Sequence, residues 1–525
     1  MVNAKLNRHV VIALGLIFLV LSSVTAEKPI AWAESVTYTI ADTTGDWGFP
    51  SPYRRYPRGP GYLRMSFLFD TLTWKNKAGD VIPALAEQWQ YLERENAYVF
   101  NLRKNATWQD GTPFTSRDVA FTVQYSKTHP MAWIDPKIIE AALPVDSHTV
   151  KLVLSRKYAP FLINVAGTMP ILPEHIWKDV NDPRAFGGQK ALVGTGPFKL
   201  LDYNKAHGSY LYEANPTYYA GQSKVDRLRF IKVSTEMVAP ALRQGQVDAG
   251  SIPPDIADRL KNEGFRVVRA PHGWHLKLVM NHTQAPLNEK AFRHALAYAI
   301  DRKALVDITQ RAHAMVGNPG FVPPDSRWYN PDVNPYEFNL DRAKRLLREL
   351  DYEVRDGQIF RGESPVRLEL LSQPRFKDVG LFIKEQLERL GFQIDIRSLE
   401  AKTLDSKVLH WQFQLAISGH GGLYEPSFLQ RAILDEEFNS VRYRRNQVLT
   451  ELIEAQLGEM DPGKRKELIF RIQELLAEDL PNLPLYYPNS YWAHNGRLDV
   501  WYTQNGVALG IPVPLNKRMF VHTRQ

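Results

Sequence analysis

The segment 98–125 constrains the fold more than any other part of the chain. Residues 98–102 place apolar side chains at alternate positions, which is typical of a half-buried strand. Asp110-Gly111 follows as a tight turn, and a helical pattern begins after it. Thr115 is a suitable N-cap for that helix, and Asp118 is placed to complete a capping box. The sequence therefore predicts a strand, a turn and a capped helix here.

The same alternation of strands with helices continues along the chain. A helix is predicted from about Asn288, and its apolar residues share one face: Phe292, Ala295, Leu296, Ala299 and Ile300. Further helices are expected at 339–350, 378–390 and 464–479, and strands at 228–233, 393–396 and 481–487. Gly391 is a suitable stop for the helix that precedes it. Strands that alternate with helices throughout predict an α/β fold.

The chain of 525 residues contains no cysteine, so packing alone must stabilise its cores. A thiol nucleophile is thereby excluded, and the GxSxG and HExxH motifs are absent as well. The formal net charge of +8 is mild for this length and is not concentrated in any block. This composition argues against nucleic-acid binding and gives no support to an enzyme.

The N-terminus has the parts of a secretory signal peptide. Lys5 and Arg8 form a basic region, residues 10–21 are apolar, and small residues follow. Residues 1–33 are expected to be removed, with a second suitable cleavage site after Ala26. The apolar run of 12 residues is too short for a stable membrane anchor, and no Cys follows it to receive a lipid.

Several segments, in order, resemble a known family. WQDGTPFTSRDVAFT (108–122), preceded by ALAEQWQ (84–90), resembles the signature of the family 5 extracellular solute-binding proteins. These are the large periplasmic receptors of peptide- and nickel-type ABC importers. Further segments that match the family pattern are GTGPFKL at 194–200, NPTYY at 215–219, LRQGQVDAG at 242–250, the run 276–307, and PNLPLYY at 481–487.

The resemblance implies a two-lobed periplasmic-binding-protein fold of the Venus-flytrap type, in the large class with an extra inserted subdomain. Lobe one would be discontinuous, from residues 34–69, 195–265 and 491–525. The inserted subdomain would occupy 70–194, and lobe two 266–490. Two hinge strands would join the lobes.

The resemblance also implies where a solute would bind, in a concave site walled by aromatic side chains with a few placed polar groups. Three segments are candidates by position: the one around Trp133, the one from His272 to His275, and the one from Ser418 to Pro426. The candidate ligand contacts in them are Trp133, Trp274, His275, His420, Gly421, Gly422, Tyr424 and Glu425.

The third segment departs from the family. Peptide-binding members carry an Asp there that pairs with the peptide's α-ammonium, whereas this chain has Gly421 or Gly422. A buried ammonium without a counter-charge costs several kcal/mol. Either Glu425 takes over that role, or the ligand has no free α-ammonium at that end.

The same segment departs from the nickel-type members, which end the loop with a His. Here Ser427 stands in its place, and His272, His275 and His420 are weak candidates to contact a metal instead. The glycine-rich loop is equally compatible with a bulky ligand such as an oligosaccharide.

The expectation is therefore a monomeric periplasmic receptor that captures a small peptide-like solute between two lobes. It would deliver the solute to an inner-membrane ABC permease with its ATPase subunits, without a cofactor. Receptors for a chelated metal or an oligosaccharide are alternatives within this class. A ligand sensor for a membrane kinase and a hydrolase are alternatives from other classes.

Overall fold

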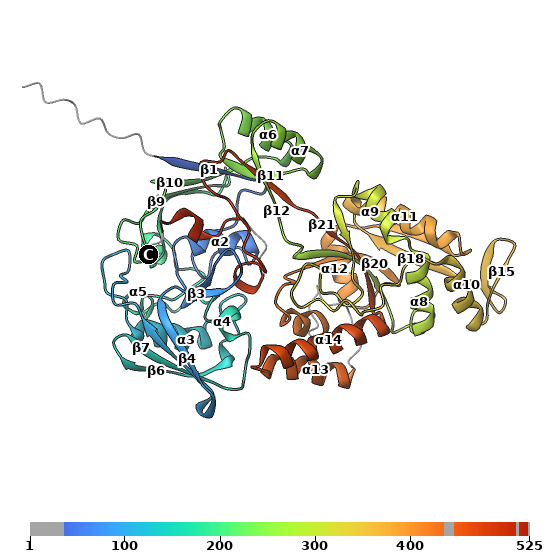
Figure 1. The fold of residues 1–525 in the computed structure, drawn as a ribbon, viewed down its shortest axis with the longest axis horizontal. Helices are drawn as coiled ribbons and strands as arrows, with labels where there is room; N and C mark the ends of the chain where they lie inside the picture. The colour runs from blue at the N-terminus through green and yellow to red at the C-terminus, as the bar shows by residue number, and fades with distance from the viewer. Residues whose placement is uncertain (1–35, 435–445, 511–513, 523–525) are drawn as a thin grey trace, which may run out of the picture.

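The computed structural model describes residues 36–434, 446–510 and 514–522, except the side chain of His420. The predicted signal peptide lies outside the described residues. Two large sheets, joined by two short segments, form the framework of the molecule (Figure 1). Within the described ranges, no helix combines the length and apolar character needed to cross a membrane.

The first sheet has seven strands in the order β12-β22-β11-β1-β10-β9-β8. Its strand bounds are β1 Thr37–Asp42, β8 Phe198–Asn204, β9 Ser209–Ala214, β10 Arg227–Lys232, β11 Ala249–Ile252, β12 Arg266–Arg269 and β22 Tyr491–His494. The helices of the same region are α2 Gly59–Ser66, α6 Thr235–Arg243 and α7 Ala257–Asn262. Strand β12 begins at Arg266, where we placed the start of lobe two, but it pairs with β22 in this first sheet.

A smaller unit lies beside the first sheet in Figure 1. It has a four-stranded sheet in the order β4-β5-β7-β6 and a two-stranded sheet β2-β3. The strands are β2 Thr73–Lys75, β3 Val81–Pro83, β4 Ala86–Leu92, β5 Ala97–Leu102, β6 Ile139–Asp146 and β7 Thr149–Leu154; the helices are α3 Ser116–Thr128, α4 Phe161–Asn164 and α5 Glu174–Trp177. One continuous apolar core, which includes Phe230 of β10 and Phe100 of β5, joins this unit to the first sheet.

The second large sheet has six strands in the order β14-β21-β13-β20-β18-β19. Its strands are β13 Trp274–Met280, β14 Ala314–Val316, β18 Arg367–Ser372, β19 Gln393–Ser398, β20 Leu415–Gly421 and β21 Asn482–Pro488. A small sheet of β15 Tyr352–Arg355, β16 Gln358–Arg361 and β17 Ser364–Pro365 lies at the outer tip (Figure 1).

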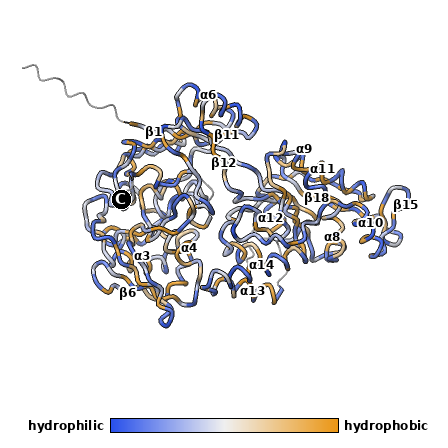
Figure 2. The backbone as a smooth tube through the Cα atoms, viewed as in Figure 1, coloured by the Kyte–Doolittle hydropathy of each residue, from blue (hydrophilic) through white to orange (hydrophobic). Residues whose placement is uncertain are grey.

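The helices that accompany the second sheet follow the predicted apolar periodicity. They are α8 Lys290–Ala299, α9 Arg302–Thr309, α10 Leu340–Glu349, α11 Lys377–Glu388, α12 Ala401–Leu409, α13 Gln447–Gly458 and α14 Pro462–Asp479. The predicted stripe of the helix near 288 is fully buried, from Phe292 to Ile300. Gly391 ends α11 with a φ of 89°, as its position predicts. Figure 2 shows hydrophobic residues concentrated along the strands and helices inside each half of the molecule.

The chain passes between the two large sheets twice. Residues 270–273 connect β12 to β13, and residues 489–490 connect β21 to β22. We call these two stretches the crossing segments. They lie side by side, because the backbone N–H of Ala270 donates to the carbonyl of Ser490 at 2.8 Å.

Candidate functional site

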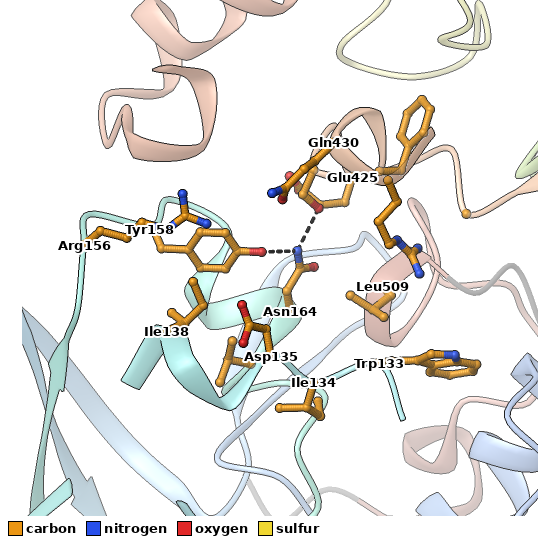
Figure 3. Close-up of a pocket in the computed structure, with 15 residues that line it drawn as sticks. Trp133, Ile134, Asp135, Ile138, Arg156, Tyr158, Asn164, Glu425, Gln430 and Leu509 are labelled. Atoms are coloured by element: carbon orange, nitrogen blue, oxygen red, sulfur yellow. Dashed lines mark hydrogen bonds between the residues drawn. The ribbon is translucent and has the colours of Figure 1, made fainter. Parts of the chain in front are cut away.

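A cavity of about 420 Å³ lies between the smaller unit and the loops that follow β20. This volume falls in the range of small-molecule binding sites. Its lining comes from three distant parts of the chain: residues 133–138 and 156–165, residues 422–431, and Leu509. Figure 3 shows Tyr158, Asn164 and Asp135 on one side of the cavity, and Glu425 and Gln430 on the other.

Asn164, the last residue of α4, joins the two sides of the cavity. Its Nδ2 donates to Tyr158 OH at 3.1 Å and to Ser427 Oγ at 2.7 Å across the cavity (Figure 3). Its side-chain Oδ1 is buried and has no hydrogen-bond partner among the described residues. Burial raises the pKa of the Tyr158 phenol, so Tyr158 stays neutral at ordinary pH.

Trp133 lines the cavity from the loop after α3. Its backbone φ of 77° lies in the left-handed region, which is uncommon for an aromatic residue. The ring stacks on Tyr62 with centroids 5.6 Å apart, and the Arg55 guanidinium lies 4.6 Å from the ring centroid. Arg55 also donates to the carbonyl of Ala132, so this strained position is fixed from two directions.

The glycines that follow β20 have different roles. Gly422 lines the cavity, has a φ of 79°, and donates its N–H to the carbonyl of Gly273 at 2.9 Å. Gly421 pairs with Trp274 in the sheet, and a Cβ there would lie 3.3 Å from the indole. An Asp at Gly422 would therefore have to adopt a left-handed backbone, and an Asp at Gly421 would crowd the Trp274 indole.

Glu425 lines the cavity but its charge is already paired. Its carboxylate is 2.5 Å from Arg465 Nη2, and the two side chains are 4% and 7% exposed. Arg465 is held in turn by the carbonyl of Gln456 and by its amide oxygen. Glu425 is thus part of a buried network within the second half of the molecule.

Other charged groups of the lining remain exposed. Asp135 Oδ1 accepts the backbone N–H of Lys137, which fixes the start of a short turn. Arg156 and Arg431 line the same cavity. None of the three forms an ion pair with another residue in the described part of the chain.

Several expected ligand contacts lie elsewhere. Trp274 stacks on Phe376 with centroids 6.5 Å apart and packs against the core of the second sheet. His275 is fully buried between Phe321 and Tyr487, and Tyr424 is buried. Trp274 and His275 are consecutive residues of β13, so they lie on opposite faces of the second sheet, and neither lines the cavity. The side chain of His420 lies outside the described residues.

His272 connects the crossing segments and does not line the cavity. Its ring nitrogens lie 2.8 Å from Asp325 Oδ2 and 2.7 Å from Asn489 Oδ1. Among the described residues, no three His, Asp or Glu side chains converge as a metal site. Another cavity, of about 550 Å³, borders the first crossing segment at Ala270 and Pro271, beside Trp501 and Tyr502.

Asp135, Arg156 and Asn164 were not among the residues expected from the sequence. Asp135 precedes a proline and Arg156 lies in a loop, and both look like ordinary surface residues in the sequence. Asn164 offers one weak signal, since it is a polar residue that ends the apolar run Phe161–Asn164.

Comparisons with known proteins agree with this architecture. Residues 80–433 match the profile described as bacterial extracellular solute-binding proteins, family 5 Middle. The dipeptide-binding protein DppE of Bacillus subtilis (strain 168) is 24% identical over 471 residues, covering 82% of each chain.

Two solved structures share the fold. NikA from Brucella suis, in complex with Fe(III)-EDTA, has a TM-score of 0.79 at 17% identity, over 93% of this chain and 100% of that chain. The oligopeptide-binding protein AppA from Bacillus subtilis, in complex with a nonapeptide, has a TM-score of 0.72 at 21% identity, over 93% and 99%. The predicted two-lobed α/β fold is confirmed. Because the profile covers more than half of the sequence, the chain belongs to the family 5 bacterial extracellular solute-binding proteins.

Proposed function

We propose that this chain is a periplasmic receptor that captures a small peptide-like solute between its lobes and delivers it to an ABC permease with its ATPase subunits. The observation that carries the proposal is the cavity of about 420 Å³, whose walls come from the smaller unit and from the loops after β20. Family membership supports the partner, and the names of DppE and AppA support the ligand class.

The lobes are proposed as residues 34–69, 195–265 and 491–525 for lobe one, with 70–194 inserted, and 266–490 for lobe two, except that β12 (Arg266–Arg269) pairs in the first sheet and is assigned to lobe one. The solute would fill the cavity and hold the lobes together, and the permease would recognise the closed form. A ligand drives such closure only by its preference for the closed state.

Binding without catalysis is part of the proposal. Hydrolysis of a glycoside needs two carboxyl groups that face each other and are free to exchange protons. Asp135 and Glu425 line the cavity, but Glu425 is held in its ion pair with Arg465. The proposal also includes a monomer, exported by a cleaved signal peptide, that does not bind nucleic acid.

Native mass spectrometry of freshly purified protein tests the function directly. We expect an additional mass that is released on mild unfolding and identifies the solute as a peptide or a related amide. A chelated metal or a sugar in its place would keep the receptor role but change the ligand class.

Small-angle scattering tests the mechanism once the solute is known. The radius of gyration should fall when the solute is added to the stripped protein. An unchanged radius at saturation would contradict closure of the lobes.

A further inference from the structure

The charges that line the cavity differ from those expected for a neutral ligand. Of its two carboxylates, Glu425 is compensated by Arg465, which leaves Asp135 as the lining acid without an ion pair in the described part of the chain. Arg156 and Arg431 are the lining cations, likewise without an ion pair among the described residues. The lining therefore offers a ligand one carboxylate, of Asp135, and two guanidinium groups, of Arg156 and Arg431.

Asn164, one of the residues that line the cavity, also carries a buried acceptor. Asn164 is 6% exposed, and both hydrogens of its amide point to hydroxyl groups, of Tyr158 and Ser427. Its Oδ1 has no partner in the described part of the chain. A buried oxygen of this kind favours a bound group that donates a hydrogen bond. An ammonium or an amide N–H meets that need, whereas a carboxylate does not.

We propose that the wall formed by Asp135 and Asn164 binds the amino-terminal end of a short peptide, and that Arg156 and Arg431 bind its carboxylates. The inference rests on the proposed function and assigns its ligand class. Asp135 would supply the counter-charge that Gly421 and Gly422 do not. With two guanidinium groups against one carboxylate, the preferred ligand is an acidic peptide.

The binding test uses four dipeptide probes in titration calorimetry: Ala-Glu, Ala-Ala, Ala-Lys and N-acetyl-Ala-Glu. For the unaltered protein we expect Ala-Glu to bind more tightly than Ala-Ala, and Ala-Ala more tightly than Ala-Lys. Acetylation removes the ammonium and should weaken binding about 10- to 100-fold, the range of one charge-assisted hydrogen bond.

The assignment of Asp135 is tested by a double-mutant cycle, in which the unaltered protein and Asp135→Asn are each titrated with Ala-Glu and with N-acetyl-Ala-Glu. Asp135→Asn should weaken Ala-Glu binding about 10- to 100-fold, and acetylation should then cause no further loss. A residue that merely supported the fold would lower affinity for both probes equally. Asp135 is exposed, so the melting temperature should stay the same.

Arg156 and Arg431 are tested by comparing the affinities of Ala-Glu and Ala-Ala for variants of each arginine. One of the variants Arg156→Gln and Arg431→Gln, at the side-chain carboxylate, should reduce the ratio of Ala-Glu to Ala-Ala affinity about tenfold, and the other, at the α-carboxylate, should weaken binding of both probes to a similar extent. Glu140→Gln and Arg94→Gln are matched controls, because both residues are exposed in the same unit and lie outside the cavity lining. Neither control should change any of the affinities.

Three outcomes would overturn the inference: unchanged Ala-Glu binding by Asp135→Asn, equal binding of the free and acetylated probes, or no binding of any probe by the unaltered protein. The receptor role is tested separately by the co-purified mass. A non-peptide solute found there would overturn this inference and leave the receptor role standing.

Discussion

Trp133 and Trp274 differ in what their indole rings contact. Trp133 lines the cavity, whereas Trp274 packs on Phe376 and against the backbone of Gly419 in the second sheet. We expect Trp133→Ala to weaken ligand binding about tenfold, because aromatic contacts add roughly 0.5–1.5 kcal/mol beyond area burial. Trp274→Ala should lower the melting temperature and leave ligand binding unchanged. Calorimetry and thermal unfolding of both variants check this, and the reverse pattern would contradict it.

Glu425 and Arg465 form a buried ion pair, and the fold is destabilised when only one of the two charges is removed. Glu425→Gln leaves the Arg465 charge buried without compensation, which should cost about 3–5 kcal/mol of unfolding free energy. The double variant Glu425→Gln with Arg465→Met should recover most of that loss.

Urea denaturation measures both variants of the buried pair. Glu385→Gln is the control, since Glu385 pairs with Arg389 on the surface at spacing i,i+4 and should lose about 0.5 kcal/mol or less. A single variant of Glu425 that is as stable as this control would show that the buried pair contributes little.

Lys75 is a buried lysine whose Nζ donates to the carbonyl of Gly506 at 3.0 Å. Burial lowers its pKa to about 8, partly offset by the attraction of Glu425. Between about pH 8 and the unfolded pKa of 10.5, the unfolded chain binds more protons at this site, so stability should rise with pH. The slope from this group is at most about 1.4 kcal/mol per pH unit.

Urea denaturation at pH 8 and pH 10 measures that slope. Lys75→Met should remove the contribution of this site, so the stability gain between the two pH values should be smaller in the variant. Equal gains in both proteins would show that Lys75 titrates as an ordinary lysine.

The candidate binding residues show what could and could not be predicted from the sequence. Trp133, Gly422 and Glu425 were expected at the site and do line the cavity. Glu425 pairs with a residue 40 positions away, and no local pattern reveals that its charge is compensated. Asp135 and Asn164 become part of one wall only when the chain has folded, because exposure and long-range contacts are properties of the tertiary structure.

At the scale of elements, the start of α3 was predicted down to its two capping residues, Thr115 and Asp118. Asp118 Oδ2 accepts the Thr115 N–H at 2.8 Å, and Asp118 Oδ1 accepts the Glu174 N–H at 3.0 Å, which ties α3 to α5. Asp118→Ala removes both bonds and should cost about 1–3 kcal/mol. Thermal unfolding checks this against Asp179→Ala, an exposed residue of the same unit that should change nothing.

Other elements were predictable for the same local reasons. The apolar face of α8 and the Gly391 stop of α11 depend on residues within a few turns of each other. Sheet order was not predictable in this way. Strand β12 pairs with β22, which lies more than 200 residues later, and the sequence pattern of neither strand encodes that choice.

At the scale of the whole molecule, hydrogen bonds between the two halves surround the cavity. Asn164 bonds to Ser427 within it, and the N–H of Ala159 donates to the carbonyl of Leu457 at 2.7 Å near the end of α13. Opening the lobes must break both contacts. In the proposed mechanism, these two bonds would stabilise the closed arrangement in addition to the ligand.

The crossing segments determine how the molecule would carry mechanical tension. Both ends of the described chain belong to the first sheet's half, and within the described ranges the backbone enters the six-stranded half through residues 270–273 and leaves it through 489–490, two stretches joined by the Ala270–Ser490 bond. A force applied at Val36 and His522 therefore bypasses the second half until β12 separates from β22. With handles on cysteines introduced at those two positions, optical tweezers should record a late release of about 70 nm, from roughly 220 residues at about 3.3 Å each. An early release of that length would contradict this load path.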